Sequence, residues 1–229
     1  GTINNIETII EKAHNFGAKV MIDGAQAASH VALNMQELNA DFYCFSAHKM
    51  YGPTGVGVLY GKEAALNALP PYQGGGEMIK EVSFEKTTYA CLPHKFEAGT
   101  PNIAGVIAFK AAIDFITALG VKNIAKYEDE LLQYATTEVL KIEGLKIYGT
   151  ATHKSGIISF NIDNLHPYDI GMIVDKMGVA IRTGHHCTQP IMKRFNIPGT
   201  ARMSFAAYNT KAEIDIAINA IKKAKQMLS

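Results

Sequence analysis

The chain has 229 residues, enough for one large domain or two modest ones with a sizeable hydrophobic core. Its 48% hydrophobic and 19% charged residues are ordinary globular usage, which excludes a disordered or low-complexity chain. The formal net charge of +1 offers no electrostatic attraction for nucleic acid or for a membrane surface, so neither is predicted as a partner.

Helical spacing of apolar residues predicts a first helix from Ile6 to Phe16, closed by Gly17. Strands are predicted over residues 18–22, 42–45 and 56–60, the first of them with the pattern of a buried strand. Strands alternating with helices indicate an α/β fold with a largely parallel sheet, which binds ligands at the carboxyl ends of its strands. Asp23 and the segment 46–49 follow two such ends.

Residues 70–101 are rich in Pro and Gly with little periodicity, so they are predicted to be a long functional loop or an interface element. A helix over 102–119, ended by Gly120, and a second helix to about residue 142 come next. Strands over 145–148, 156–162, 179–182 and 201–205, with helices over 168–177 and 211–228, complete an α+β module. We therefore predict two domains, residues 1–122 and 123–229.

Asp23 allows two interpretations. A carboxylate at the end of a buried strand needs a partner, and one such partner is the protonated ring nitrogen of pyridoxal phosphate. The other interpretation is an N-cap of a short following helix, which is the more common role for an isolated Asp before a helix.

Lys49 follows a hydrophobic strand together with Ser46 and His48, and a Gly-rich turn at 52–55 comes next. A hydroxyl and an imidazole can both bind a phosphate group, and Gly lets backbone approach a ligand closely. A lysine amine can form a Schiff base with an aldehyde cofactor. A solitary lysine after a strand is usually a solvated surface residue, but its coincidence with Asp23 and Gln26 favours a cofactor site.

Cys187 lies between Arg182 and Pro190, next to His185 and His186. A lone cysteine is most often a buried structural residue, but cationic neighbours in a polar turn favour a reactive thiolate. Neighbouring side chains diverge and a structural zinc site needs four ligands, so no metal is predicted.

Six segments of the chain together resemble the class V aminotransferase group of fold-type I pyridoxal-phosphate enzymes. They are VMIDGAQAASH (20–30), DFYCFSAHKMYGPTGVGVLYG (41–61), QGGGEMI (73–79), FEAGTPN (96–102), RTGHHCTQP (182–190) and RMSFAAYNT (202–210). The RTGHHC stretch is similar to group-II, Suf-type cysteine desulfurases, which overlap with selenocysteine lyases. This resemblance implies a cofactor-binding large domain followed by a smaller α+β domain, and an N-terminal part that is missing from the sequence.

The resemblance implies a role for each site residue. Lys49 would hold the cofactor and move the substrate α-proton, and Cys187 would accept sulfur from L-cysteine as a persulfide; L-selenocysteine is the other possible substrate. Asp23 would pair with the ring nitrogen, Gln26 with the ring oxygen, and Ser46 and His48 with the phosphate. Thr100 would reach the cofactor phosphate of a partner subunit, which implies a homodimer. Arg202 would bind the substrate carboxylate, with Arg182 as a second active-site arginine.

The resemblance also implies a sulfur-acceptor protein and a place in iron–sulfur cluster assembly. Cys44 and Cys91 are predicted to be structural or incidental. Three cysteines without a Cys-x-x-Cys pair suit a reducing compartment, so a cytoplasmic protein is expected. No apolar run reaches the roughly 20 residues of a membrane helix, and the sequence opens without a leader or an initiator Met.

Three alternatives stay open: another class V enzyme such as a selenocysteine lyase or an aminotransferase, a non-catalytic scaffold that binds a sulfur acceptor through the Cys187 turn, and a plain α/β domain. Because part of the pocket would come from the missing segment, the 229 residues alone are expected not to be fully active.

Overall fold

The computed structural model describes all 229 residues, which form two compact units. The first unit comprises Asn5–Lys122, and the second comprises Asn123–Ser229 together with Gly1–Asn4. The change of unit after Lys122 falls where the sequence predicts a boundary, apart from the first four residues. That these units are the domains of a longer protein stays a prediction.

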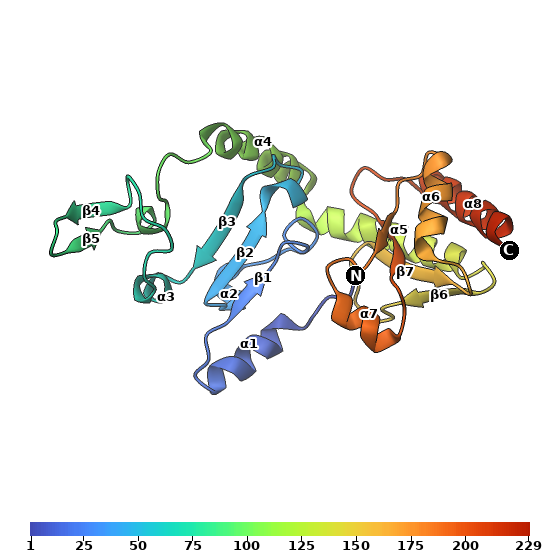
Figure 1. Ribbon diagram of the computed structural model, residues 1–229, viewed down its shortest axis with the longest axis horizontal. Coiled ribbons are helices and arrows are strands. Elements are labelled where there is room, and N and C mark those ends of the chain that lie inside the picture. The colour runs from blue at the N-terminus through green and yellow to red at the C-terminus, as the bar shows by residue number, and fades with distance from the viewer. The chain divides into compact units, whose positions relative to one another are not determined.

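The first unit is built on a three-stranded sheet with the order β1-β2-β3 (Figure 1). Helix α1 begins at the N-cap Asn5 and packs Ile10 against Tyr43 of the sheet, and the last helix, α4, packs Phe109 and Ala112 against Ala47. In chain order its elements are α1 (Ile6–Asn15), β1 (Met21–Asp23), α2 (Met35–Leu38), β2 (Phe42–Ser46), a 3₁₀ turn (Ala47–Lys49), β3 (Gly57–Gly61), α3 (Glu63–Ala68), β4 (Ile79–Val82), β5 (Thr87–Tyr89), a second 3₁₀ turn (His94–Phe96) and α4 (Ile103–Leu119).

Strand pairing in this sheet is mixed. β1 runs parallel to β2, with Asp23 opposite Cys44, whereas β2 and β3 are antiparallel, with Ser46 opposite Gly57. Only ten residues, 47–56, connect β2 to β3, and a parallel crossover needs a dozen or more. The α/β class is confirmed, while the parallel part of the sheet within this chain is the β1–β2 pair.

The prediction of a buried first strand is wrong for this chain. Met21 is 58% exposed and Asp23 is also exposed, with only Ile22 between them partly buried. β1 is an edge strand, and the apolar cluster of α1, β2 and β3 covers one of its faces only. A run of apolar residues does not distinguish a strand covered on both faces from one covered on a single face.

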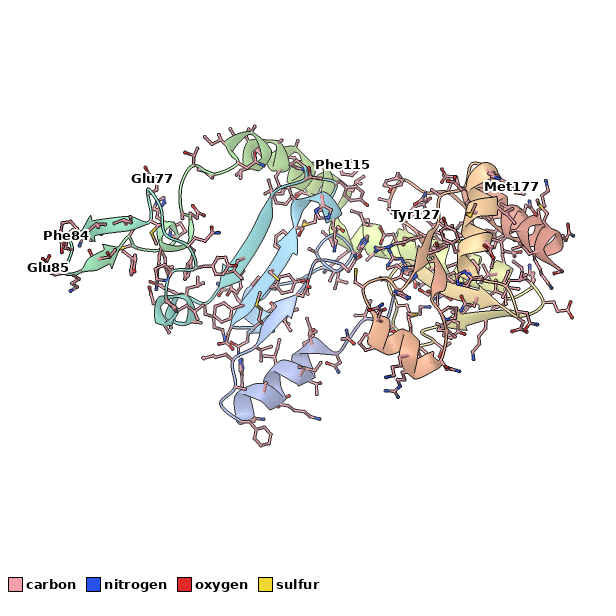
Figure 2. The ribbon with its side chains drawn as sticks, in the orientation of Figure 1. Glu77, Phe84, Glu85, Phe115, Tyr127 and Met177 are labelled. Carbon is pink, nitrogen blue, oxygen red and sulfur yellow. The ribbon has the colours of Figure 1, made fainter.

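The segment 70–101 contains a β-hairpin, which the sequence prediction missed. β4 pairs antiparallel with β5, and their connecting turn is closed by the Ser83 hydroxyl, which accepts hydrogen bonds from the amides of Glu85 and Lys86. Figure 2 shows Phe84 and Glu85 at the tip of this hairpin, and Phe84 is fully exposed. Two strands of three and four residues are too short to give a periodic signal.

The second unit is an antiparallel four-stranded sheet with the order β6-β7-β9-β8. Ile158, Phe160 and Ile162 alternate along β7 toward a core shared with three helices, α5, α6 and α8. Its elements are α5 (Val121–Val139), β6 (Leu145–Tyr148), β7 (Ile157–Ile162), α6 (Pro167–Lys176), β8 (Arg182–Gly184), α7 (Gln189–Phe195), β9 (Thr200–Ser204) and α8 (Lys211–Leu228).

The sequence predicts a strand over 179–182, but the observed strand, β8, begins later in the chain because pairing with β9 starts only at Arg182. Residues 179–181 and 203–205 instead line a hollow of about 290 Å³ beside α8. Helix α7, with Pro190 in its first turn, was not predicted.

No helix of the structure, taken alone, has the length and apolar content of a membrane span; α4 and α5 meet that test only when they are counted together as a bent pair.

Candidate functional site

The carboxyl ends of β1 and β2 lie side by side at one edge of the first-unit sheet, because the two strands are parallel neighbours. Asp23 is opposite Cys44, so both side chains leave the same face of the sheet. Ser46, two residues beyond Cys44, leaves that face as well, about 7 Å farther along the strand direction. The carboxylate of Asp23 and the hydroxyl of Ser46 therefore share one edge and one face, as the sequence predicts for a site.

Asp23 makes a local hydrogen bond: its Oδ1 accepts the amide of Ala25 at 3.0 Å. Residues 25–30 form turns and no α-helix begins there, so this bond closes a turn rather than capping a helix. Gly24 extends the pairing of β1, since its amide donates to the carbonyl of Cys44 at 2.8 Å. A Cβ at Gly24 would lie 1.9 Å from the ring of Tyr43, so no larger residue fits at this position.

Lys49 lies in the 3₁₀ turn that follows β2. Ala47 anchors this turn, because it is fully buried against Phe109 and Ala112 of α4. The carbonyl of Lys49 accepts a hydrogen bond from the buried hydroxyl of Ser29 at 3.0 Å. This bond joins the turn after Asp23 to the turn that carries Lys49. The sequence reasoning assigned no role to Ser29, since nothing in its spacing marks a contact 20 residues away.

The other predicted residues of this unit are solvent-accessible. Gln26, His48 and Lys49 are exposed, and Ser46 is half-buried. Thr100 is exposed in the loop before α4, where the N-cap residue Asn102 donates to the carbonyl of Gly55 at 3.4 Å. The structure brings Asp23, Ser46 and Lys49 to one sheet edge, and Thr100 belongs to a different segment near the Gly-rich turn.

The donor set of this edge fits a phosphorylated aromatic aldehyde. An exposed amine, a carboxylate on the same face as a hydroxyl, and a neighbouring imidazole are the groups needed to hold an aldehyde, a ring nitrogen and a phosphate.

A second cluster lies within the second unit and contains Arg182, Cys187 and Arg202. Arg182 of β8 and Arg202 of β9 are directly paired across the sheet, so both side chains leave one face. A guanidinium nitrogen of Arg182 lies 3.9 Å from the Sγ of Cys187, which is exposed. The structure therefore brings together the predicted thiol and both predicted arginines.

Arg202 lacks a compensating carboxylate. Its side chain is half-buried, and its Nε is buried without a hydrogen-bond partner. Burial lowers the pKa of Arg202 and the charge of Arg182 lowers it further, while the thiol group of Cys187 acts in the opposite direction. Two adjacent guanidinium groups with no carboxylate between them have the charge and the hydrogen-bond donors that an anion-binding site requires.

Cys187 lies in a tight turn with unusual backbone angles. His186 has φ 53° and Cys187 has φ 63°, and the amide of Thr188 closes the turn onto the carbonyl of His185 at 2.9 Å. Positive φ at both central residues is the geometry of a type I′ turn, which favours Asn and Gly. Each non-Gly residue in this region costs about 1–3 kcal/mol, so other contacts must hold the turn in place.

The His186 side chain connects this turn to β9. Its Nε2 lies 2.9 Å from the hydroxyl and 3.0 Å from the carbonyl oxygen of Thr200, which is almost fully buried in β9. Close packing of Gly199 against the backbone of Gly184 brings the two strands together just before the turn, since a Cβ at Gly199 would lie 2.9 Å from the Gly184 carbonyl oxygen. His186 was visible in the sequence as part of a His-His-Cys run, but its partner was not.

The remaining cysteines differ from Cys187 in their surroundings. Cys44 is half-buried in β2, and burial together with the nearby Asp23 carboxylate raises the pKa of its thiol. Cys91 is exposed in the loop after β5.

Residues 1–216 match the protein-family model described as Aminotransferase class-V. The chain is 48% identical to a cysteine desulfurase of Enterobacter sp. (strain 638) over 229 residues, which are 100% of this chain and 56% of that protein. It is 48% identical to a probable cysteine desulfurase of Halalkalibacterium halodurans over 226 residues, or 99% of this chain and 55% of that protein.

Among solved structures, the cysteine desulfurase CsdA of Escherichia coli, in an S-sulfonic acid form, superimposes with a TM-score of 0.95 at 39% identity. The match covers 100% of this chain and 57% of that one. The chain thus spans little more than half the length of the relatives that it matches.

Proposed function

Because this chain belongs to the class V aminotransferase family, we propose that the protein containing it is a pyridoxal-phosphate-dependent cysteine desulfurase. It would remove sulfur from L-cysteine, release L-alanine and leave a persulfide on Cys187. The observation that carries this proposal is the cluster of Cys187 with two arginines that have no carboxylate partner. Identity of 48% to a cysteine desulfurase over the whole chain supports it.

We assign the cofactor site to the first unit and the substrate-binding arginines to the second. When bound, pyridoxal phosphate supplies an aldehyde for covalent attachment of an amine and a ring that accepts electrons from the substrate α-carbon. Lys49 would provide the attaching amine and then carry the α-proton. Asp23 would keep the ring nitrogen protonated, and Gln26 would donate to the ring oxygen. Ser46 and His48 would bind the phosphate.

Arg202 would bind the carboxylate of the amino-acid substrate through its guanidinium group, with Arg182 beside it. Cys187 would then attack the substrate sulfur as a thiolate. The new bond forms between the two sulfur atoms while the carbon–sulfur bond breaks and its electron pair remains on carbon. The β-carbon would take up a proton that matches the one lost from the substrate thiol, and Lys49 would return the α-proton to the α-carbon, which gives alanine and leaves the sulfur atom on Cys187. The 3.9 Å contact with Arg182 supports this role, because it places the sulfur atom beside the arginines proposed to bind the substrate.

The finer assignments follow from the motifs. The RTGHHC segment, residues 182–187, supports a group-II, Suf-type enzyme that passes sulfur to an acceptor protein for iron–sulfur cluster assembly. The match of Thr100 to the family motif supports a homodimer, in which Thr100 of each subunit would reach the cofactor phosphate of the other subunit. Three free cysteines support a cytoplasmic location.

Substitution at Cys187 tests the proposal. In the full-length protein, Cys187→Ala should lower sulfur release from L-cysteine by at least about 100-fold while leaving the cofactor absorbance unchanged. Cys91→Ala is the matched control, since Cys91 is an exposed thiol of the other unit. Sulfide production by the Cys187 variant at the rate of the unmodified protein would refute the assignment. Faster turnover of L-selenocysteine that survives the Cys187 substitution would instead indicate a selenocysteine lyase.

A further inference from the structure

We propose that His186 is a positioning residue for Cys187, acting through its hydrogen bonds to Thr200. The inference rests on the proposed function only in taking Cys187 to be the sulfur acceptor. The structural basis is the turn His185–Thr188, in which the thiol and the imidazole occupy the two central positions.

The first step of the argument is that the turn is not stable through its own sequence. Both central residues have positive φ, and neither is Gly or Asn, the residues that adopt this conformation at low cost. The turn has one backbone hydrogen bond, from Thr188 to His185, and one side-chain bond between the same residues, at 2.7 Å. Both bonds close the ends of the turn, and neither fixes its direction relative to the sheet.

The second step is that only one of the two central side chains makes short contacts with a buried residue of the sheet. The Cys187 side chain is exposed, with the guanidinium group of Arg182 at 3.9 Å. The His186 side chain, in contrast, is half-buried and its Nε2 lies within 3.0 Å of two oxygen atoms of Thr200. Thr200 is 1% exposed and belongs to β9, two residues before Arg202. His186 therefore links the thiol-bearing turn to the strand that carries the anion-binding arginine.

The third step concerns the charge of the imidazole. Burial lowers the pKa of His186, and the neighbouring charges of Arg202, Arg182 and His185 lower it further, against the opposing effect of the Thr200 carbonyl. A neutral ring protonated at Nε2 donates to the Thr200 carbonyl oxygen and leaves Nδ1 without a proton. This agrees with the surroundings of Nδ1, which is buried and has no partner.

The experiment measures the alkylation rate of Cys187 by iodoacetamide, resolved by peptide mass spectrometry, in the full-length protein. Because the thiol is already exposed, we do not expect loss of the His186–Thr200 contact to improve the access of iodoacetamide. We expect it to let the sulfur atom move away from the guanidinium group of Arg182. We expect His186→Ala to slow alkylation of Cys187 several-fold, with Cys91 as an internal reference whose rate is unchanged. His185→Ala is the matched control, since the bonds described for His185 use its backbone carbonyl.

Substitutions at Thr200 keep the test valid if His186→Ala unfolds. Thr200→Val removes the hydroxyl partner of His186 at nearly constant volume but keeps the backbone carbonyl partner, so it should slow alkylation by a smaller factor than His186→Ala. Thr200→Ser keeps both partners and should alkylate at the original rate. In the desulfurase assay, His186→Ala should lower kcat about tenfold and change KM for L-cysteine less than twofold.

The proposal is overturned if His186→Ala and Thr200→Val, both folded, alkylate at the original rate. It is overturned also if Thr200→Ser slows alkylation as much as Thr200→Val does. Alkylation needs neither cofactor nor substrate, so its result does not depend on whether the protein proves to be a desulfurase.

Discussion

At the scale of single residues, the Arg182–Arg202 pair is a close pair of like charges in the second unit. Two guanidinium groups directly across a β-ladder repel each other, and Arg202 is also partly desolvated. Such an arrangement is unfavourable by itself and becomes favourable when an anion binds. This is a reason to assign Arg202 to substrate binding rather than to stability.

Arg202→Lys should therefore weaken substrate binding. Lysine keeps the positive charge but cannot bind a carboxylate through two parallel hydrogen bonds. We expect KM for L-cysteine to rise about 10-fold or more, with a smaller change in kcat. Steady-state kinetics of the full-length protein measures both. An unchanged KM would mean that the substrate carboxylate is bound elsewhere.

At the scale of elements, β1 and β2 are held in register by a buried carboxylate at their amino ends. Asp41 accepts hydrogen bonds from the Val20 amide at 2.9 Å and the Lys19 amine at 3.1 Å, and it lies 2.8 Å from Nε2 of His14. Burial alone would raise the pKa of Asp41, but these bonds prevail and hold it well below the ordinary range. Since the register determines that Asp23 lies opposite Cys44, this network helps to set the cofactor edge.

Asp41→Asn should lower the free energy of unfolding by about 2–4 kcal/mol at neutral pH. A depressed pKa stabilises the fold above the unfolded-state value, near 3.9, and this contribution is lost as the pH falls toward the folded-state value. The difference between the two proteins should thus shrink below about pH 4. Urea denaturation of the two proteins at neutral pH and below about pH 4 measures this difference. The control is Asp114→Asn, which removes an exposed ion pair with Lys110 on α4 and should lower the free energy of unfolding by less than about 0.5 kcal/mol. An equally small decrease for Asp41→Asn would contradict the account.

Elements with strong end signals were predictable from the sequence. The bounds of α8 agree with the prediction, because Thr210 and Glu213 form a capping box, and α4 begins at its N-cap Asn102 and ends at Gly120. The β4–β5 hairpin and α7 were missed because three to seven residues do not establish a period. The strand over 179–182 was displaced because apolar residues there line a hollow instead of pairing.

Contacts within the site were less predictable than its residues. Asp23, Ser46, Lys49, Cys187 and both arginines could be selected by motif. The hydrogen bond from Ser29 to Lys49 and the contact of His186 with Thr200 could not be, since they join residues 20 and 14 positions apart through the tertiary fold.

At the scale of the whole molecule, one face of the first-unit sheet has little cover in this chain. Met21 and Leu59 are 58% and 49% exposed, and they share a face with Asp23 and Cys44. Exposed apolar faces of this kind associate with other surfaces in water. The chain spans 56% of its Enterobacter relative, so the longer protein has further residues that could cover this face.

Residues 1–229 expressed alone should therefore bind the dye ANS and self-associate more strongly than the full-length protein. Replacing Met21 and Leu59 together by Thr should reduce both signals, because Thr retains strand propensity and lowers the apolar area. Phe16→Ser is the matched control, an exposed apolar residue that lies outside the sheet. Sedimentation velocity and dye fluorescence measure the effect, and equal reduction by the control would contradict it.

The most direct test of the account is peptide mass spectrometry of the full-length protein after incubation with L-cysteine. Lys49 and Cys187 are proposed to act in sequence, the first on the amino-acid carbon and the second on its sulfur. We predict one additional sulfur atom on the peptide that contains Cys187, and none on that peptide when Lys49 is replaced by Ala. Alanine release with no sulfur on Cys187, or sulfur on Cys187 in the Lys49 variant, would contradict the account.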